Sequence, residues 1–219
     1  MPLQNLLTPR RVHLLGGVSD AGKTRFVIPA VANWTGAPSW VYVVGDRTLE
    51  DAQDTMNDMG INPQSIVTVP AFGQHNKSSL MEIMCAVENQ APQAELIVIE
   101  GFQDFCPGTG TKRDVREYLS NAHAYLGKTR AHPNGLTILG VVESPKLKPT
   151  ERYSDPRQRI SGPAGWGYHA STVMLIEPAD KNDSMAVPER IMWICHKGVQ
   201  RRKVDGTFDA LNRLVFPSL

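Results

Sequence analysis

The sequence predicts an α/β fold, with a mainly parallel sheet between two layers of helices and antiparallel strands at its C-terminal edge. Short apolar runs alternate with helical segments through the first two thirds of the chain. Two of these runs, at residues 95–100 and 136–142, contain consecutive aliphatic residues, which is typical of strands covered on both faces. The last third is richer in turns. We therefore expect one three-layer domain over residues 1–219, with a short N-terminal arm at residues 1–10.

The individual elements follow from local patterns. Strands are predicted at residues 11–16, 40–44, 66–69, 95–100 and 136–142, and helices at residues 23–33, 48–59, 78–88 and 111–130. Thr48, with Asp51 three residues later, is typical of a helix N-cap. After a segment rich in proline, glycine and charge, the strand-like runs at 171–176, 190–195 and 214–216 form the expected antiparallel edge.

Composition excludes several classes of protein. The 219 residues are 41% hydrophobic, which is enough for one substantial core. The 23 basic and 22 acidic residues leave no general basic excess, so any nucleic-acid binding has to come from a local patch. Three scattered cysteines, without a CxxC or HExxH motif, favour neither a disulfide framework nor a zinc site. No apolar run approaches the ~20 residues of a membrane span, and we expect a cytoplasmic protein without a membrane partner.

Residues 17–24 read GVSDAGKT and match the phosphate-binding pattern G-x-x-x-x-G-K-[ST], between a strand and a helix as the P-loop requires. Gly17 and Gly22 are expected to adopt backbone angles closed to other residues, so that N–H groups converge on an anion. The helix that starts near Gly22 adds its positive end. Lys23 should reach the β- and γ-phosphates of ATP, and the Thr24 hydroxyl should bind Mg²⁺. The predicted cradle comprises Gly17, Val18, Ser19, Asp20, Ala21, Gly22, Lys23, Thr24 and Arg25.

The alternative interpretation of this run is a glycine-rich turn with an incidental lysine. From average residue usage, the pattern arises by chance in about one chain in a hundred of this length. The requirement for a preceding strand and a following helix lowers that figure. We therefore expect a phosphate site here.

Carboxylates at the ends of strands complete the expected site. Glu100 ends the apolar run ELIVIE and is the candidate for holding Mg²⁺. Asp46 follows the run WVYVV and is the candidate for polarising the attacking water. Glu50 and Asp51 lie in the next turn, where the alternative is charge that complements a helix dipole. Asp104 is a weaker candidate for the water.

With these motifs at 17–24 and 96–100, the sequence resembles the RecA-like ATPases over residues 12–216. It looks closest to the plasmid and bacteriophage proteins related to the RepA and DnaB hexameric helicases, which implies a bacterial host cytoplasm. In that family a Glu commonly follows the second strand as the catalytic base. Here the matching position is Asp46, so Asp and Glu are exchanged between Asp46 and Glu100 relative to the family pattern.

The resemblance also assigns roles to later segments. Glu143 and Ser144 stand where the family often has a His or Gln that senses the γ-phosphate. Residues 195–202 resemble the strand and turn that supply lysine and arginine fingers to the neighbouring subunit's nucleotide, here Lys197 and Arg201, with Arg202 as a substitute. The alternative is a solvated basic turn. Fingers supplied in trans imply a homo-oligomer, and the resemblance implies a hexameric ring.

Two loops, at residues 102–113 and 144–165, would face a central pore according to the same resemblance. The second loop combines basic side chains with Tyr153, which suits backbone tracking and base stacking on single-stranded nucleic acid. A subunit contact or a disordered lid is an equally open interpretation of such a loop. The candidate nucleic-acid contacts are Lys146, Lys148, Arg152, Arg157 and Arg159.

Three functions remain open at this point. The first is an oligomeric, helicase- or translocase-like nucleic-acid motor driven by Mg²⁺-dependent ATP hydrolysis. The second is a nucleotide-controlled assembly or regulatory switch that needs no nucleic acid. The third is a small-molecule kinase, which the Asp46-Arg47 pair after the second strand would fit weakly.

Overall fold

The computed structural model describes most of the chain. The described residues are 3–32, 40–45, 47–71, 79–105, 117, 118, 120, 122, 136–144, 155–160, 169–179, 188–197, 201–217 and 219. Four predicted site residues, Asp46, Lys146, Lys148 and Arg152, lie outside this part of the chain, as does most of the helix predicted at 111–130.

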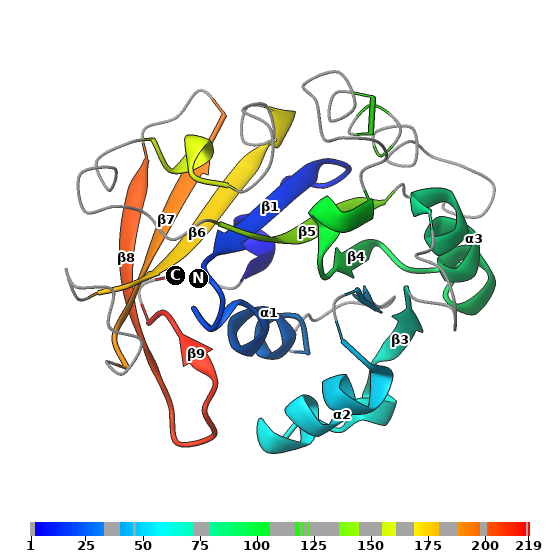
Figure 1. The fold of residues 1–219 in the computed structure, drawn as a ribbon, viewed down its shortest axis with the longest axis horizontal. Helices are drawn as coiled ribbons and strands as arrows, with labels where there is room; N and C mark the ends of the chain where they lie inside the picture. The colour runs from blue at the N-terminus through cyan, green and yellow to red at the C-terminus, as the bar shows by residue number, and fades with distance from the viewer. Residues whose placement is uncertain are drawn as a thin grey trace.

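The described strands form one nine-stranded sheet in the order β3-β2-β4-β5-β1-β6-β7-β8-β9 (Figure 1). All pairings from β3 across to β6 are parallel, and those from β6 to β9 are antiparallel. This confirms the predicted α/β class and its antiparallel C-terminal edge. The strands are β1 (Val12–Gly17), β2 (Trp40–Val44), β3 (Val67–Pro70), β4 (Leu96–Ile99), β5 (Thr137–Glu143), β6 (Thr172–Pro178), β7 (Arg190–His196), β8 (Arg202–Phe208) and β9 (Leu214–Val215).

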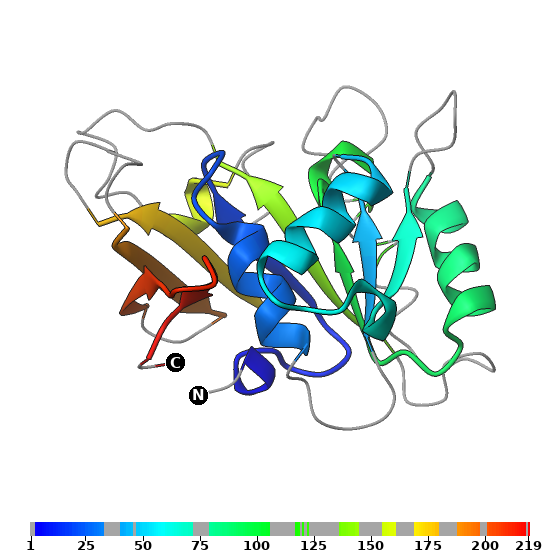
Figure 2. The same cartoon turned by 90° about the horizontal axis from the view of Figure 1, so that it is seen from below.

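Helices cover both faces of the sheet. Figures 1 and 2 show α1 (Lys23–Ala32) and α2 (Leu49–Asp58) side by side on one face. On the opposite face, α3 (Leu80–Gln90) contributes its apolar side to a second buried cluster with residues of β2 and β4. Because both faces are covered, the central strands carry uninterrupted aliphatic runs, and all four residues of β4 are buried.

Local sequence signals account for where the helices begin. Thr48 caps α2 in a capping box with Asp51, which confirms the predicted N-cap. Ser79 and Glu82 form the same arrangement at the start of α3. Short 3₁₀ turns at η1 (Leu3–Asn5), η2 (Pro63–Ser65), η3 (Phe102–Phe105) and η5 (Pro156–Gln158) complete the described helical elements.

Strand β8 was not predicted. Its inner face carries Val204 and Gly206, which are buried, and Phe208, which is partly buried against the core. An added Cβ at Gly206 would lie 2.4 Å from the ring of Phe216, so this glycine lets the aromatic ring lie against the strand. Phe216 in turn meets Phe26 of α1 edge to face, with 5.3 Å between the ring centroids. The C-terminal strands are thereby packed onto the helix that follows the phosphate motif.

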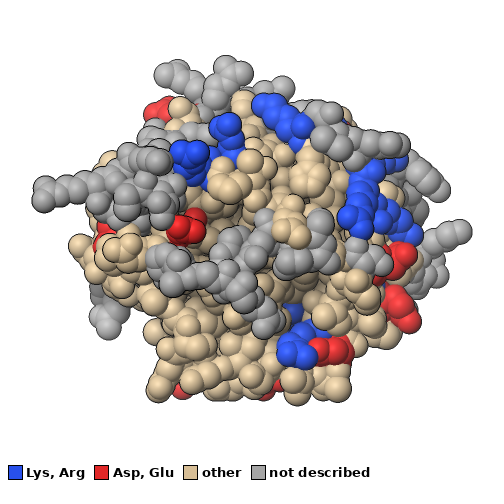
Figure 3. All heavy atoms as spheres, turned by 180° about the vertical axis from the view of Figure 1, so that it is seen from behind, with Lys and Arg blue, Asp and Glu red and all other residues tan. Residues whose placement is uncertain are grey.

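The N-terminal segment is part of this packing. Leu3, Leu6 and Leu7 are buried in the cluster that includes α1 and α2. Within the described residues, no helix has both the length and the apolar character to cross a bilayer. Seen from behind in Figure 3, the described lysine and arginine side chains lie in separate groups instead of one continuous basic surface.

Gly45, directly after β2, sets the close approach of β2 to β4. A Cβ at this position would lie 2.0 Å from the Glu100 carbonyl oxygen and 3.2 Å from the Phe105 ring. We expect Gly45→Ala to lower the free energy of unfolding by about 3 kcal/mol or more, because backbone atoms cannot yield as side chains do. Denaturant titration measures this. Gly60→Ala is the control, since Gly60 has a positive φ of 69° but its Cβ would come no closer than 3.4 Å to another residue. Its expected loss is about 1 kcal/mol, and equal losses in the two variants would contradict the steric argument.

Candidate functional site

The phosphate motif forms the turn between β1 and α1, as predicted. Gly22 adopts a φ of +95°, and Asp20 takes a second left-handed position with a φ of 61°. Gly17 differs from the prediction, because it is the last residue of β1 and is not among the residues with positive φ. A Cβ on Gly17 would lie 2.9 Å from the Ile176 carbonyl oxygen and 3.1 Å from Ala21, so close approach requires glycine there. Asp tolerates the left-handed region better than most residues, which explains Asp20.

Lys23 is turned back over the loop. Its Nζ donates hydrogen bonds to the carbonyl oxygens of Gly17 and Val18, each at 2.9 Å. The ammonium group is therefore held across the turn that the sequence identifies as the anion cradle. A phosphate oxygen, being charged, would be a stronger acceptor for it than these carbonyls.

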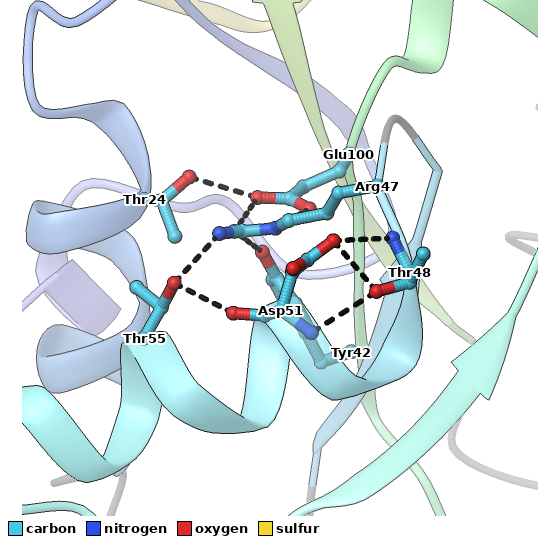
Figure 4. Close-up of polar contacts among 7 residues, drawn as sticks. All are labelled: Thr24, Tyr42, Arg47, Thr48, Asp51, Thr55 and Glu100. Carbon is cyan, nitrogen blue, oxygen red and sulfur yellow. Dashed lines mark hydrogen bonds and ion pairs between the residues drawn. The ribbon is translucent and has the colours of Figure 1, made fainter.

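Thr24 and Glu100 meet although they are 76 residues apart in the chain. The Thr24 hydroxyl donates a hydrogen bond to Oε1 of Glu100, with 2.8 Å between the oxygens (Figure 4). Glu100 directly follows β4 and is only 2% exposed. Two oxygens that are neighbours in the octahedral shell of Mg²⁺ lie about 3.0 Å apart, because each is about 2.1 Å from the ion. The pair predicted to hold the metal therefore has the right chemistry and spacing.

The protein offers this metal few ligands. Among the residues that the structure describes, no group of three His, Cys, Asp or Glu side chains could enclose an ion. One hydroxyl and one carboxylate suit Mg²⁺, which keeps several waters and is usually completed by substrate phosphates. The fit is to Mg²⁺ bound together with a nucleotide.

Arg47 was considered in the sequence only as part of the Asp46-Arg47 pair of a possible kinase, and its contact with Glu100 was not predicted. It donates from Nη2 to Oε1 of Glu100 at 2.5 Å and from Nε to Oε2 at 3.1 Å (Figure 4). The same guanidinium donates to the Tyr42 hydroxyl at 3.1 Å and to Thr55 Oγ1 at 3.0 Å. Burial by itself lowers the pKa of Arg47, but Tyr42 and Glu100 outweigh it and hold the pKa above its usual value. The buried Glu100 carboxylate is thus neutralised by a charged arginine.

The other carboxylates that the sequence offered for catalysis differ in their position relative to the cavity. Asp51 accepts hydrogen bonds from the backbone N–H and hydroxyl of Thr48, and these bonds hold the pKa of Asp51 below its usual value. It serves as a helix cap. Asp104 lies in η3 and is absent from the described lining of the cavity. Glu143, at the end of β5 and in register with Gly17, does line it.

These groups surround one cavity of about 570 Å³. The predicted residues on its wall are Ser19, Asp20, Gly22, Lys23, Thr24, Arg25, Glu100 and Glu143, and the residues not predicted are Arg47, Thr55, Pro188, Arg190, Phe208 and Asn212.

The unexpected wall comes from the C-terminal strands. Arg190, at the start of β7, is buried, and its Nε donates to the Ala21 carbonyl oxygen at 3.3 Å. Its guanidinium carbon lies 5.0 Å from the ring centroid of Phe208, and burial lowers the pKa of Arg190. A Cβ on Gly22 would come within 2.8 Å of the Phe208 ring. The antiparallel edge therefore supports the phosphate turn, a contact that no local sequence pattern reveals.

Lys197 and Arg201 lie far from their own chain's cavity. Because β7 runs antiparallel, Arg190 stands at the cavity end of this strand, and Lys197 stands at the opposite end, where its N–H donates to Ser171. The N–H of Ser171 donates to the carbonyl oxygen of Val12, the first residue of β1. Val12 is about 16 Å along the strand from Gly17, where β1 ends at the cavity. Both predicted finger residues are exposed, and the Arg201 guanidinium carbon lies 5.3 Å from the Trp193 ring centroid.

Two of the five predicted nucleic-acid contacts, Arg157 and Arg159, lie in the described part of the chain. Each of them forms an ion pair with a carboxylate of this chain. Arg157 pairs with Asp155, with 2.7 Å between Nη2 and Oδ2. Arg159 is buried and forms an ion pair with Glu177, which also accepts a hydrogen bond from the Trp193 indole. Contrary to the prediction, the Arg159 side chain is not at the surface, where a nucleic-acid strand could reach it.

Comparison of the chain with protein-family models and with curated proteins finds no match.

Proposed function

We propose that this chain is a Mg²⁺-dependent ATPase of the RecA-like class. The observation that carries the proposal is the convergence of Lys23, Thr24 and Glu100 in one cavity at the mouth of the phosphate turn. A glycine-rich turn with an incidental lysine would have no reason to face a buried carboxylate from a separate strand. The mainly parallel sheet, with this turn at the C-terminal end of a central strand, agrees with ligand binding in α/β folds.

The roles of the residues follow from their positions. The backbone N–H groups of the turn and the start of α1 bind phosphate oxygens. Lys23 exchanges its carbonyl partners for phosphate oxygens and stabilises charge that develops during transfer. Thr24 and Glu100 would hold Mg²⁺, which supplies further neutralisation of the phosphates. Asp46 stays the candidate for polarising the attacking water.

We further propose that the chain acts as an oligomeric motor on single-stranded nucleic acid. The support is the position of Lys197 and Arg201, which are exposed at the end of the sheet remote from their own chain's cavity, so that a finger role for them requires the nucleotide of another subunit. Steady-state ATP hydrolysis with and without single-stranded DNA or RNA tests the proposal. Stimulation of several fold by one polymer is expected. Hydrolysis that neither polymer changes would contradict the motor and favour a nucleotide-controlled assembly switch.

Mixing of variants tests whether the fingers act in trans. We expect K23A and the double variant K197A/R201A to hydrolyse ATP poorly when separate. When mixed, a K23A subunit presents intact fingers to a neighbour with an intact cradle, so the hydrolysis rate should exceed the sum of the separate rates. Lys203→Ala is the control, because Lys203 is a nearby exposed lysine paired with Asp205. A mixed rate equal to the sum would contradict fingers in trans.

A further inference from the structure

We propose that Arg47 is a resident counter-ion that a metal ion has to displace from Glu100, so that the chain binds its metal with the nucleotide and not before it. This inference rests on the proposed function of the cavity, but it concerns the nucleotide-free protein. It assigns Arg47 a positioning role in metal binding that the phosphate motif does not imply.

Arg47 and Thr24 together bind both oxygens of the Glu100 carboxylate. Oε1 accepts from the Thr24 hydroxyl and from Nη2 of Arg47, and Oε2 accepts from Nε of Arg47. The carboxylate is buried, so water cannot readily replace these donors. A metal ion that approaches Glu100 therefore meets a neutral pair, and it must compete with a two-point ion pair in a site of low dielectric.

Arg47 is also held in place by residues outside its ion pair with Glu100. Tyr42, which is fully buried in β2, accepts from Nη2, and Thr55 on α2 accepts from Nη1. Thr55 itself donates to the Asp51 carbonyl oxygen at 2.8 Å, which fixes the orientation of its hydroxyl. The fork of the guanidinium reaches Glu100, Tyr42 and Thr55 together, which the single ammonium of a lysine could not do.

A bound nucleotide would release the Glu100 carboxylate from Arg47. Arg47 and Lys23 line the same cavity, so phosphates bound near Lys23 offer the guanidinium another anion. Arginine binds phosphate oxygens as well as it binds carboxylates. The anionic nucleotide therefore compensates Arg47 while Glu100 accepts the metal, and the two ligands bind cooperatively.

Binding of Mn²⁺ to the nucleotide-free protein, followed by electron paramagnetic resonance of the free ion, tests this directly. Wild type should bind Mn²⁺ weakly, and Arg47→Gln should bind it about tenfold or more tightly, because the competing charge is gone. The double variant R47Q/E100Q should lose this gain. Arg25→Gln is the matched control, since it removes the same charge from the same cavity wall while Arg25 contacts the Asn212 carbonyl and not Glu100. Equal Mn²⁺ affinity in wild type and R47Q, or an equal gain in R25Q, would overturn the proposal.

Circular dichroism would reveal whether R47Q folds. If it does not, a milder variant tests the same proposal. Thr55→Val removes one acceptor of Arg47 and keeps its pair with Glu100, so we expect Mn²⁺ affinity to rise by about twofold to fivefold. No rise in T55V would then overturn the proposal. ATP binding by wild type in the presence of Mg²⁺ is measured in parallel. Its absence would refute the proposed function, whereas ATP binding without any gain of Mn²⁺ affinity in the variants would refute only the role of Arg47.

Discussion

Replacement of Lys23 by alanine is expected to reduce ATP hydrolysis by about a hundredfold or more. The ammonium group lies across the phosphate turn with two hydrogen bonds to Gly17 and Val18. Two charge-assisted hydrogen bonds to phosphate oxygens contribute about 3 to 4 kcal/mol when they form in the transition state, and each 1.4 kcal/mol is a factor of ten in rate. Steady-state phosphate release at saturating Mg²⁺ and ATP measures the loss.

The fold should survive this change, because the hydrogen bonds of Lys23 to Gly17 and Val18 go to carbonyl groups of its own turn, where water can take the place of the ammonium group. The melting temperature of K23A is expected to stay close to that of wild type. Lys203→Ala, which removes an exposed lysine remote from the cavity, should hydrolyse ATP at the wild-type rate. If K23A kept a third or more of the wild-type rate, the turn at residues 17–24 would not be the catalytic phosphate site.

Glu100→Ala is expected to affect both stability and hydrolysis. It leaves the partly buried Arg47 guanidinium without its carboxylate, and the loss of one partner of a buried ion pair costs about 3 to 5 kcal/mol. Arg47 is 22% exposed, and water can therefore recover part of that energy. We expect a loss of about 3 kcal/mol in the free energy of unfolding, measured by denaturant titration.

Glu100→Gln separates the two effects. The amide oxygen still accepts from Arg47 and Thr24, so the stability loss should be about 1 to 2 kcal/mol. An amide binds Mg²⁺ far less well than a carboxylate, so both variants should lose Mg²⁺-dependent hydrolysis by about a hundredfold. Unfolding free energies equal to wild type in E100A would contradict the structural role of the pair. Full hydrolysis in E100Q would contradict the metal role of Glu100.

Local sequence patterns were sufficient to predict those parts of the structure whose geometry depends on residues close together in the chain. The position of the turn at residues 17–24 could be predicted because its glycines, lysine and threonine lie within eight residues, between an apolar strand and a helix. Strand β4 could be predicted because a run of aliphatics has to be covered on both faces. The cap at Thr48 could be predicted because a capping box spans only three residues.

The rest of the site depends on contacts between segments far apart in the chain. A charged residue after a strand is usually solvated, and nothing near Arg47 in the sequence indicates that it reaches Glu100, 53 residues away. Arg190 is similar, since it meets the phosphate turn 169 residues away. Strand β8 has only Val204 and Phe208 as hydrophobic residues on its inner face, with Gly206 between them, which is too few for a periodic signal. Arg159 was predicted to be an exposed loop residue because its partner, Glu177, lies in a separate strand and cannot be inferred from the local sequence.

The proposed function requires that the cavity at the end of β1 binds ATP together with Mg²⁺. Isothermal titration of the wild-type chain with ATP, in the presence of Mg²⁺ and again in the presence of EDTA, tests it most directly. The account predicts one site per chain, which binds ATP more tightly with Mg²⁺ than without it and is lost in K23A. Absence of ATP binding under both conditions, or binding that K23A leaves unchanged, would contradict it.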